Sequence, residues 1–439
     1  MAARWKLVCN IGGLTLGTLC TVQAFRKIQS SRFTTFASEK CSYELVHAQI
    51  AFRHGARTPV YRLPEMVGRG KGIDDVTWDK DVIMGDLPQT MIEFRVRNID
   101  GGNQPEYSPN IKKVKKLKGG CICGELTKVG QQQTFDLGRT LQKRYVDDIK
   151  LLSPVFTPHE VYIRSTNVPR TIKSAKCVVA GLYGKENIQR VLHIITRDER
   201  EDTILPNMSF CPLLTRWLRK IQASSIQKIN LEGYAKDHST IRNDLGITAK
   251  NFFFVCFRDV MSAREAHGLF VDPILHEYWD MIDQHATEEL VVVQCGNLGK
   301  RFARQDIIKA SVGKFLDEIV TRMNDKINGI SPAQHKMCLY SVHDTSISCL
   351  LTALGVFDNK WPDFASEVAF ELYRNQDNKY FVKVLYQGKA QHLPGNNTDL
   401  CPFEKFKALL APQMTNDWQS QCIYEDKDSE TIIKIGGDV

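Results

Sequence analysis

Three short apolar runs, each followed at once by polar residues suited to acid–base or phosphate chemistry, place the strongest constraint on the fold. Leu45–Phe52, Glu160–Ile163 and Lys336–Val342 are followed by R-H-G-A-R-T-P, R-S-T-N and H-D, respectively. Short apolar runs of this kind are typical of buried strands in a parallel sheet. Because ligands bind outside the carboxyl ends of such strands, we expect the three polar clusters to meet at one site.

The first cluster, from Arg53 to Pro59, brings two guanidinium groups and one imidazole into five residues. Arginine forms planar, forked hydrogen bonds with phosphate oxygens and keeps its charge at any working pH. The like charges of Arg53 and Arg57 lower the pKa of His54, so its ring stays neutral and nucleophilic. Gly55 allows the backbone to approach a ligand closely. The cluster predicts a phosphate pocket with His54 as the nitrogen nucleophile at its floor.

The string R-H-G-x-R-x-P resembles the signature of the histidine acid phosphatases, and R-S-T-[DN]-x-x-R-T and V-H-D-x-[ST] are similar to two later motifs of that family. The resemblance implies that His54 carries the phosphoryl group and that Asp344 protonates the leaving oxygen. It also implies that four residues bind the phosphate: Arg53, Arg57, Arg164 and His343. No metal or cofactor is expected, because the arginines supply the charge that Mg²⁺ would bring. Asn167 stands where this family commonly has Asp.

Further strings are similar to the lysophosphatidic acid phosphatase branch of that family: R-S-T-N itself, Leu117–Gln133, Val146–Pro154 and Leu354–Pro362. The resemblance weakens between residues 186 and 251, where substrate choice would be set. It implies a metal-independent phosphomonoester hydrolase that converts lysophosphatidic acid to monoacylglycerol and phosphate. The implied partner is a phospholipid-type phosphomonoester, and peripheral contact of the enzyme with a membrane is compatible with such a substrate. We expect a monomer.

Other activities are compatible with the same motifs. One alternative is an inositol polyphosphate phosphatase or another small-molecule acid phosphatase on the same fold. A mutase-like phosphoryl carrier would use a similar pocket but keep water out. A third alternative is a non-catalytic module that binds phosphate or lipid, although all six residues carried over from the family are intact.

The resemblance implies an α/β fold, namely a phosphoglycerate-mutase-like three-layer sandwich with a mostly parallel central sheet and a helical cap. We expect residues 39–185 and 333–425 to form the α/β core. Residues 60–120 look irregular, and residues 186–332 show no alternation of strands and helices, so we predict that the latter form a mostly helical cap. Residues 426–439 end polar and Gly-rich and are expected to fray.

Residues 1–38 contain no Asp or Glu and run basic, apolar and basic again, which is typical of a targeting leader. We predict a mitochondrial transit peptide, with a secretory signal or a membrane anchor as alternatives. Five of the 58 basic residues fall in this leader, so the remainder carries 53 basic and 50 acidic residues, a net charge of about +3. This dispersed charge argues against a nucleic-acid partner.

The chain has 13 cysteines but no C-x-x-C pair, which argues against a zinc site. Their spacings indicate no clear disulfide framework. The segment Phe252–Phe257 is aromatic, and two uses are open for it: core packing, or the lining of an acyl-chain pocket.

Overall fold

The computed structural model describes residues 43–63, 76–108, 115–223, 231, 233–247, 252–296, 305–330 and 335–423. The predicted leader and the predicted frayed tail lie outside these residues, so mitochondrial targeting stays a prediction.

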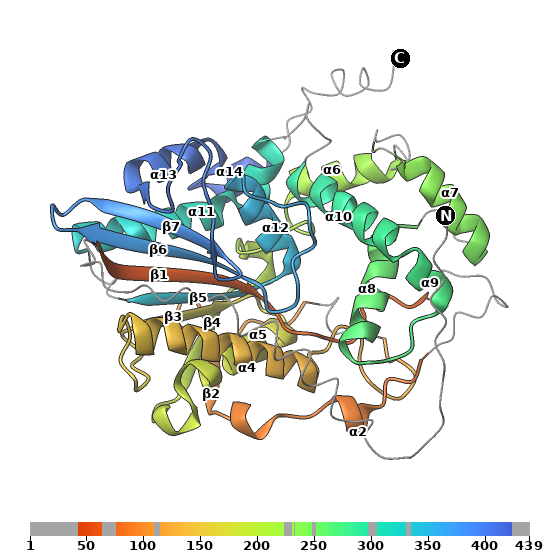
Figure 1. Ribbon diagram of the computed structural model, residues 1–439, viewed down its shortest axis with the longest axis horizontal. Coiled ribbons are helices and arrows are strands. Elements are labelled where there is room, and N and C mark those ends of the chain that lie inside the picture. The colour runs from red at the N-terminus through yellow and green to blue at the C-terminus, as the bar shows by residue number, and fades with distance from the viewer. Residues whose placement is uncertain are drawn as a thin grey trace, which may run out of the picture. The chain divides into compact units, whose positions relative to one another are not determined.

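A mixed central sheet organises the described part of the chain (Figure 1). Its strands run in the order β2-β4-β3-β5-β1-β6-β7-β8, with β9 beside β7. The pairs from β2 to β1 are parallel, and the pairs from β1 to β9 are antiparallel. The strands are β1 (Tyr43–Arg53), β2 (Phe94–Asn98), β3 (Val161–Ser165), β4 (Leu192–Thr196), β5 (Met337–Val342), β6 (Glu367–Asn375), β7 (Tyr380–Tyr386), β8 (Lys389–Ala390) and β9 (Cys401–Pro402).

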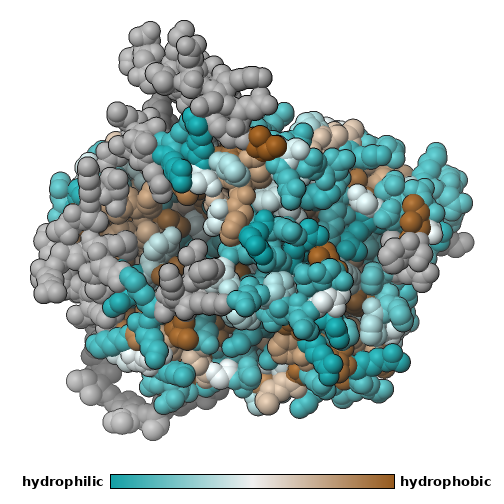
Figure 2. All heavy atoms as spheres, turned by 180° about the vertical axis from the view of Figure 1, so that it is seen from behind, coloured by the Kyte–Doolittle hydropathy of each residue, from teal (hydrophilic) through white to brown (hydrophobic). Residues whose placement is uncertain are grey.

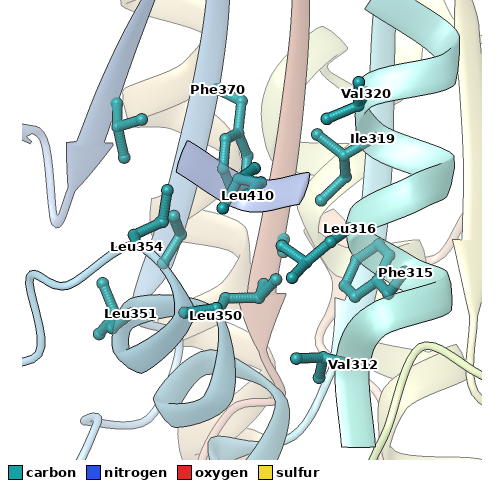
Figure 3. Close-up of a cluster of buried hydrophobic side chains, with 14 of the residues drawn as sticks. Val312, Phe315, Leu316, Ile319, Val320, Leu350, Leu351, Leu354, Phe370 and Leu410 are labelled. Atoms are coloured by element: carbon teal, nitrogen blue, oxygen red, sulfur yellow. The ribbon is translucent and has the colours of Figure 1, made fainter. Parts of the chain in front are cut away.

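Helices cover both faces of this sheet (Figure 1). One face packs against α4 (Lys128–Gln142) and α5 (Pro169–Tyr183). The other packs against α11 (Gln305–Asn328), α12 (Asp344–Ala353) and α13 (Phe403–Leu410). On this second face, side chains from α11, α12 and the strands interlock in one apolar layer, with Phe315, Leu316, Leu350 and Phe370 among them (Figure 3). These layers confirm the predicted three-layer α/β sandwich.

A group of helices forms the cap: α6 (Pro212–Ala223), α7 (Tyr234–Leu245), α8 (Phe254–Ala266), α9 (Pro273–Glu277) and α10 (Trp279–Cys295). They share a second apolar core in which Phe252, Phe254 and Phe257 are buried against one another, so these rings pack as core. The disulfide Cys211–Cys422 ties the start of α6 to α14 (Trp418–Cys422). The spacing of the cysteines had not indicated this bridge.

Shorter elements complete the described residues: helix α2 (Lys80–Ile83), the π-helical turn Lys143–Asp148 that continues α4, and the 3₁₀ turns Pro88–Thr90, Lys185–Asn187, Glu199–Glu201 and Ala411–Gln413. The face that points away from the viewer in Figure 1 is mostly hydrophilic, with small hydrophobic spots dispersed over it (Figure 2). None of the helices in the described ranges is long and apolar enough to cross a membrane.

Three elements correct the predicted organisation. Strand β4 and helix α11 both fall inside residues 186–332, predicted as cap, yet β4 belongs to the central sheet and α11 packs on it. Strand β2 falls inside residues 60–120, predicted as irregular, and pairs with β4 along its whole length. Both strands have only five residues, too few for their alternation to be visible among polar neighbours.

Candidate active site

The carboxyl ends of three neighbouring parallel strands form the site. Strand β5 pairs with β1 on one side, where Arg53 lies opposite Val342, and with β3 on the other. The three polar clusters therefore leave the sheet side by side, as the sequence predicted. The structure brings together five of the six predicted residues: Arg53, His54, Arg57, His343 and Asp344.

His54 lies buried at the centre of this group. Its Nδ1 is 2.8 Å from the backbone oxygen of Gly55, and because a carbonyl only accepts, Nδ1 carries the proton and donates it. The lone pair of the ring is therefore on Nε2. Burial lowers the pKa of His54 well below its usual value, and the charges of Arg170, Arg53 and Arg57 lower it further. The result is a neutral imidazole with one nitrogen available as a nucleophile.

Two glycines allow the backbone of the loop that carries His54 to pack closely against the backbone at the start of α4. A Cβ at Gly55 would lie 2.1 Å from the backbone oxygen of Gly130, and a Cβ at Gly130 would lie 2.0 Å from that of Ala56. Neither position can accept a side chain while the two backbones stay this close. Gln133 then accepts a hydrogen bond from Ala56 N at 2.8 Å, and Thr127, which caps the helix, donates its N–H to Ala56 O at 3.2 Å.

Arg57 is held by the cap. Its Nη1 lies 2.7 Å from Oδ1 of Asp259 on α8, and the backbone N–H groups of Val60 and Tyr61 donate to the other oxygen of that carboxylate at 2.7 and 3.2 Å. Burial alone lowers the pKa of Arg57, but Asp259 outweighs this effect and raises it. Sequence reasoning missed Asp259, which lies 200 residues after the end of the motif in a region without any recognised string.

Asp344 is the first residue of α12 and contacts Arg53 directly. Nη2 of Arg53 is 2.7 Å from Oδ2, the N–H of Thr345 donates to Oδ1 at 2.9 Å, and the indole of Trp361 donates to Oδ2 at 3.2 Å. Burial raises the pKa of Asp344, but the charges of Arg53 and Arg57 outweigh burial and lower it to about 2. Without a substrate, this carboxyl is therefore ionised.

Arg53 is itself fixed by the loop that follows Trp361. Its Nη1 donates to the backbone oxygen of Pro362 at 2.6 Å, and its guanidinium lies 4.2 Å from the centroid of the Phe364 ring. Burial lowers the pKa of Arg53 to about 10, although Asp344 opposes this shift. The guanidinium is therefore charged and oriented before any ligand arrives.

The structure does not bring Arg164 into the group, which corrects the prediction that it binds phosphate. Its side chain leaves β3 on the face covered by α11, where it pairs with Glu318 and, at 3.1 Å, with Asp202. Burial lowers the pKa of Arg164, but these two carboxylates raise it overall. The physical reason is the strand periodicity: side chains alternate between faces, and Arg164 points to the same face as Tyr162.

Arg170 occupies the place that the sequence had assigned to Arg164. It lies in the first turn of α5, and its Nη2 donates to Nδ1 of His343 at 3.4 Å. In the described part of the chain no carboxylate pairs with it, and its buried Nε has no hydrogen-bond partner. Burial and the charge of Arg57 lower the pKa of Arg170 to about 9. A half-buried guanidinium with no carboxylate partner is costly unless an anion joins it.

The signal for Arg170 was already visible in the sequence. It is the second arginine of R-S-T-N-V-P-R-T and directly follows Pro169, a residue that favours the first turn of a helix. A side chain at a helix N-terminus beside the end of a parallel strand faces the ligand side of the sheet.

Hydroxyl groups fix the ring of His343. Because Nδ1 accepts from Arg170, Nε2 carries the proton and donates to Oγ1 of Thr166 at 3.0 Å, and Thr166 in turn contacts the hydroxyl of Thr171 at 2.8 Å. Burial and Arg170 lower the pKa of His343 well below its usual value. The rings of His343 and His54 lie with centroids 5.6 Å apart, edge to face.

The departure at Asn167 has a local explanation. Its amide nitrogen donates to the backbone oxygens of Pro105 and Glu106 at 3.0 and 3.2 Å, and its oxygen accepts from Nε2 of Gln104 at 2.9 Å. A carboxylate could not donate to either carbonyl. Asn167 therefore fastens the loop of residues 104–106 beside the site.

Comparison with known proteins agrees with this geometry. Residues 44–387 match the family described as the histidine phosphatase superfamily (branch 2). Lysophosphatidic acid phosphatase type 6 of Bos taurus is 35% identical over 370 residues, which cover 83% of this chain and 82% of that protein. Prostatic acid phosphatase of Homo sapiens is 27% identical over 363 residues, 79% of this chain and 90% of that protein.

Among solved structures, the apo form of a Hafnia alvei phytase superposes with a TM-score of 0.58. It is 16% identical and covers 88% of this chain and 100% of its own, so this likeness concerns the fold alone. The sequence matches, together with the parallel neighbours β1 and β5 that deliver R-H-G-A-R-T-P and H-D to one site, lead to one conclusion. The chain belongs to branch 2 of the histidine phosphatase superfamily and is a histidine acid phosphatase.

Proposed function

We propose that this enzyme hydrolyses lysophosphatidic acid to monoacylglycerol and phosphate through a phosphohistidine on His54. The observation that carries the proposal is the lone pair on Nε2 of His54, to which no described residue donates a hydrogen bond, among the guanidiniums of Arg53, Arg57 and Arg170. The three equatorial oxygens around phosphorus match three such cations, which neutralise charge without a metal ion.

The proposed reaction has two steps. In the first, Asp344 takes the proton of the bound phosphate monoanion, Nε2 of His54 forms a bond to phosphorus, the bond to the ester oxygen breaks, and Asp344 passes that proton to the ester oxygen. In the second, Asp344 takes a proton from water, the water oxygen attacks phosphorus, and the bond to His54 breaks. His343 joins the phosphate when Arg170 turns from it to the ligand, because the Thr166 hydroxyl can then donate to Nε2 and leave the proton on Nδ1.

The pH dependence follows from the ionised state of Asp344. Because its pKa is about 2 in the free enzyme, the proton for the leaving group has to arrive with the substrate, as the phosphate monoanion. A phosphate monoester loses this proton at about pH 6. We expect kcat/KM to fall about tenfold per pH unit above that point.

Two substrates check this expectation. An alkyl phosphate needs this proton on its leaving oxygen, whereas 4-nitrophenolate leaves without one. The alkaline fall of kcat/KM should therefore be steep for the alkyl phosphate and weak for 4-nitrophenyl phosphate. An equally steep fall for both substrates would mean that a group of the enzyme sets it.

The substrate class is supported by the surroundings of the phosphate site. Val60, Tyr61 and Ile122 expose 46%, 42% and 37% of their surface, although they are large and apolar. A Cβ built on Gly124 would lie 3.4 Å from the Val60 side chain and 3.8 Å from Nη1 of Arg170, so apolar surface adjoins a phosphate-site cation. This combination suits a phosphate monoester with an acyl chain.

A substrate panel tests the proposal. We expect kcat/KM for lysophosphatidate to exceed that for glycerol 3-phosphate, which has the same head group without the acyl chain, by about tenfold or more. Phytate serves as the competing class, because solved structures of similar fold are phytases. A preference for phytate over lysophosphatidate would replace the proposed substrate by inositol polyphosphates, while equal rates on both glycerol esters would remove the acyl chain from recognition.

A further inference from the structure

The side chain of Trp361 contacts the proposed proton donor but has no role in the two steps proposed above. The indole of Trp361 is nine-tenths buried, and its Nε1 donates to Oδ2 of Asp344 at 3.2 Å. Oδ2 also forms an ion pair with Nη2 of Arg53 at 2.7 Å, whereas Oδ1 accepts a hydrogen bond from the N–H of Thr345 at 2.9 Å. The two donors on Oδ2 differ in what a phosphate does to them. An arriving phosphate monoanion competes for Nη2 of Arg53, but it leaves the neutral indole where it is.

The indole is clamped from the cap. The guanidinium of Arg258 on α8 lies over the ring of Trp361, 4.5 Å from its centroid, and its Nε donates to Oδ1 of Asp283 on α10 at 2.6 Å. A cation on the face of an indole is attracted by the ring and makes the N–H edge a better donor. A chain of contacts therefore runs from α10 through α8 and Trp361 to the carboxyl of Asp344.

We propose that Trp361 is the positioning residue of the proton donor Asp344, and that Arg258 holds the indole in place from the cap. When Nη2 of Arg53 turns its hydrogen bond from Asp344 to the phosphate, Oδ2 keeps the Trp361 N–H on one side and has a lone pair open on the other. That lone pair takes the substrate proton and faces the leaving oxygen. The inference rests on the proposed role of Asp344 as the acid, and it adds a residue that acts only through it.

The variant Trp361→Phe keeps an aromatic ring and removes the N–H. An alkyl phosphate needs a proton on its leaving oxygen, whereas 4-nitrophenolate leaves without one. We therefore expect kcat/KM, which reports all steps up to departure of the leaving group, to fall about 10- to 100-fold for the alkyl phosphate. For 4-nitrophenyl phosphate it should fall less than about threefold. The readout is kcat/KM for the alkyl phosphate divided by kcat/KM for 4-nitrophenyl phosphate. Asp344→Asn, which removes the proton donor, gives the lowest value expected for this ratio.

Two further variants sharpen the test. Trp418→Phe is the matched control, because Trp418 Nε1 donates to the backbone oxygen of Ala310 at 2.8 Å, away from Asp344; its ratio should equal that of the unmodified enzyme. Arg258→Met keeps an unbranched side chain on the indole and removes the cation. It should lower the ratio in the same direction as Trp361→Phe but by less, and it carries the test alone if Trp361→Phe does not fold.

An unchanged ratio in Trp361→Phe, whether both rates hold or both fall equally, would overturn the positioning role. An unchanged ratio in Arg258→Met would overturn the clamp. If the unmodified enzyme hydrolysed neither substrate, the proposed function itself would fail, which separates that outcome from failure of this inference.

Discussion

Replacing His54 by Ala is expected to lower kcat by about 10⁵-fold or more for every phosphomonoester, because it removes the nitrogen that takes the phosphoryl group. The remaining cations would still bind phosphate. Inorganic phosphate should therefore inhibit residual activity, or protect the variant against unfolding, at concentrations close to those effective for the unmodified enzyme. Phosphate release from the purified variant measures the loss.

His47 supplies a matched control on the same strand. It is buried like His54, its Nδ1 lies 2.9 Å from the backbone oxygen of His335, and burial lowers its pKa to about 3. His47→Ala should cost roughly 2–4 kcal/mol of stability while the folded fraction keeps its turnover. Folded His54→Ala enzyme that retained more than about 1% of kcat would contradict the nucleophile assignment.

Arg170 and Arg164 should separate catalysis from stability. Arg170→Met is expected to lower kcat/KM on the order of 10²- to 10³-fold, since it removes a cation that faces the transferring phosphoryl group. Its thermal stability should hold or rise. The folded-state pKa of Arg170 is lowered to about 9, so the charged side chain is less stable in the folded protein than in the unfolded chain at neutral pH.

Arg164→Met should show the reverse. It leaves Asp202 and Glu318 without their buried partner, which is expected to cost about 3–5 kcal/mol of unfolding free energy. The kcat/KM of the folded fraction should stay within about tenfold of normal. Thermal melts and initial rates on 4-nitrophenyl phosphate measure both quantities. A large catalytic loss with unchanged stability in Arg164→Met would return the phosphate-binding role to that residue.

The parallel part of the sheet and most of the site could be predicted from the sequence, because parallel strands restrict where the residues that follow them can lie. Once Leu45–Phe52, Glu160–Ile163 and Lys336–Val342 are strands of one parallel sheet, their carboxyl ends face the same edge. This placed His54 beside Asp344 across nearly 300 residues of chain, as the ion pair between Arg53 and Asp344 now makes plain.

The choice between Arg164 and Arg170 needed information that apolar patterning does not carry. Both faces of a central parallel strand are buried, so the sequence does not reveal which face receives Arg164. In the structure, the ion pair with Glu318 on α11 holds Arg164 on the face away from the site, and Glu318 lies more than 150 residues after Arg164 in the sequence. Asp259 and Trp361 were missed for a related reason, because each acts through a contact between distant segments.

The most direct test of the account is to trap the phosphorylated enzyme. Enzyme mixed with ³²P-labelled 4-nitrophenyl phosphate, quenched in alkali within one turnover and digested, should carry the label on the peptide that contains His54, bound to Nε2. The label should be absent from His54→Ala and present in His47→Ala. Label on another residue, or turnover with no labelled protein, would contradict the proposed phosphohistidine.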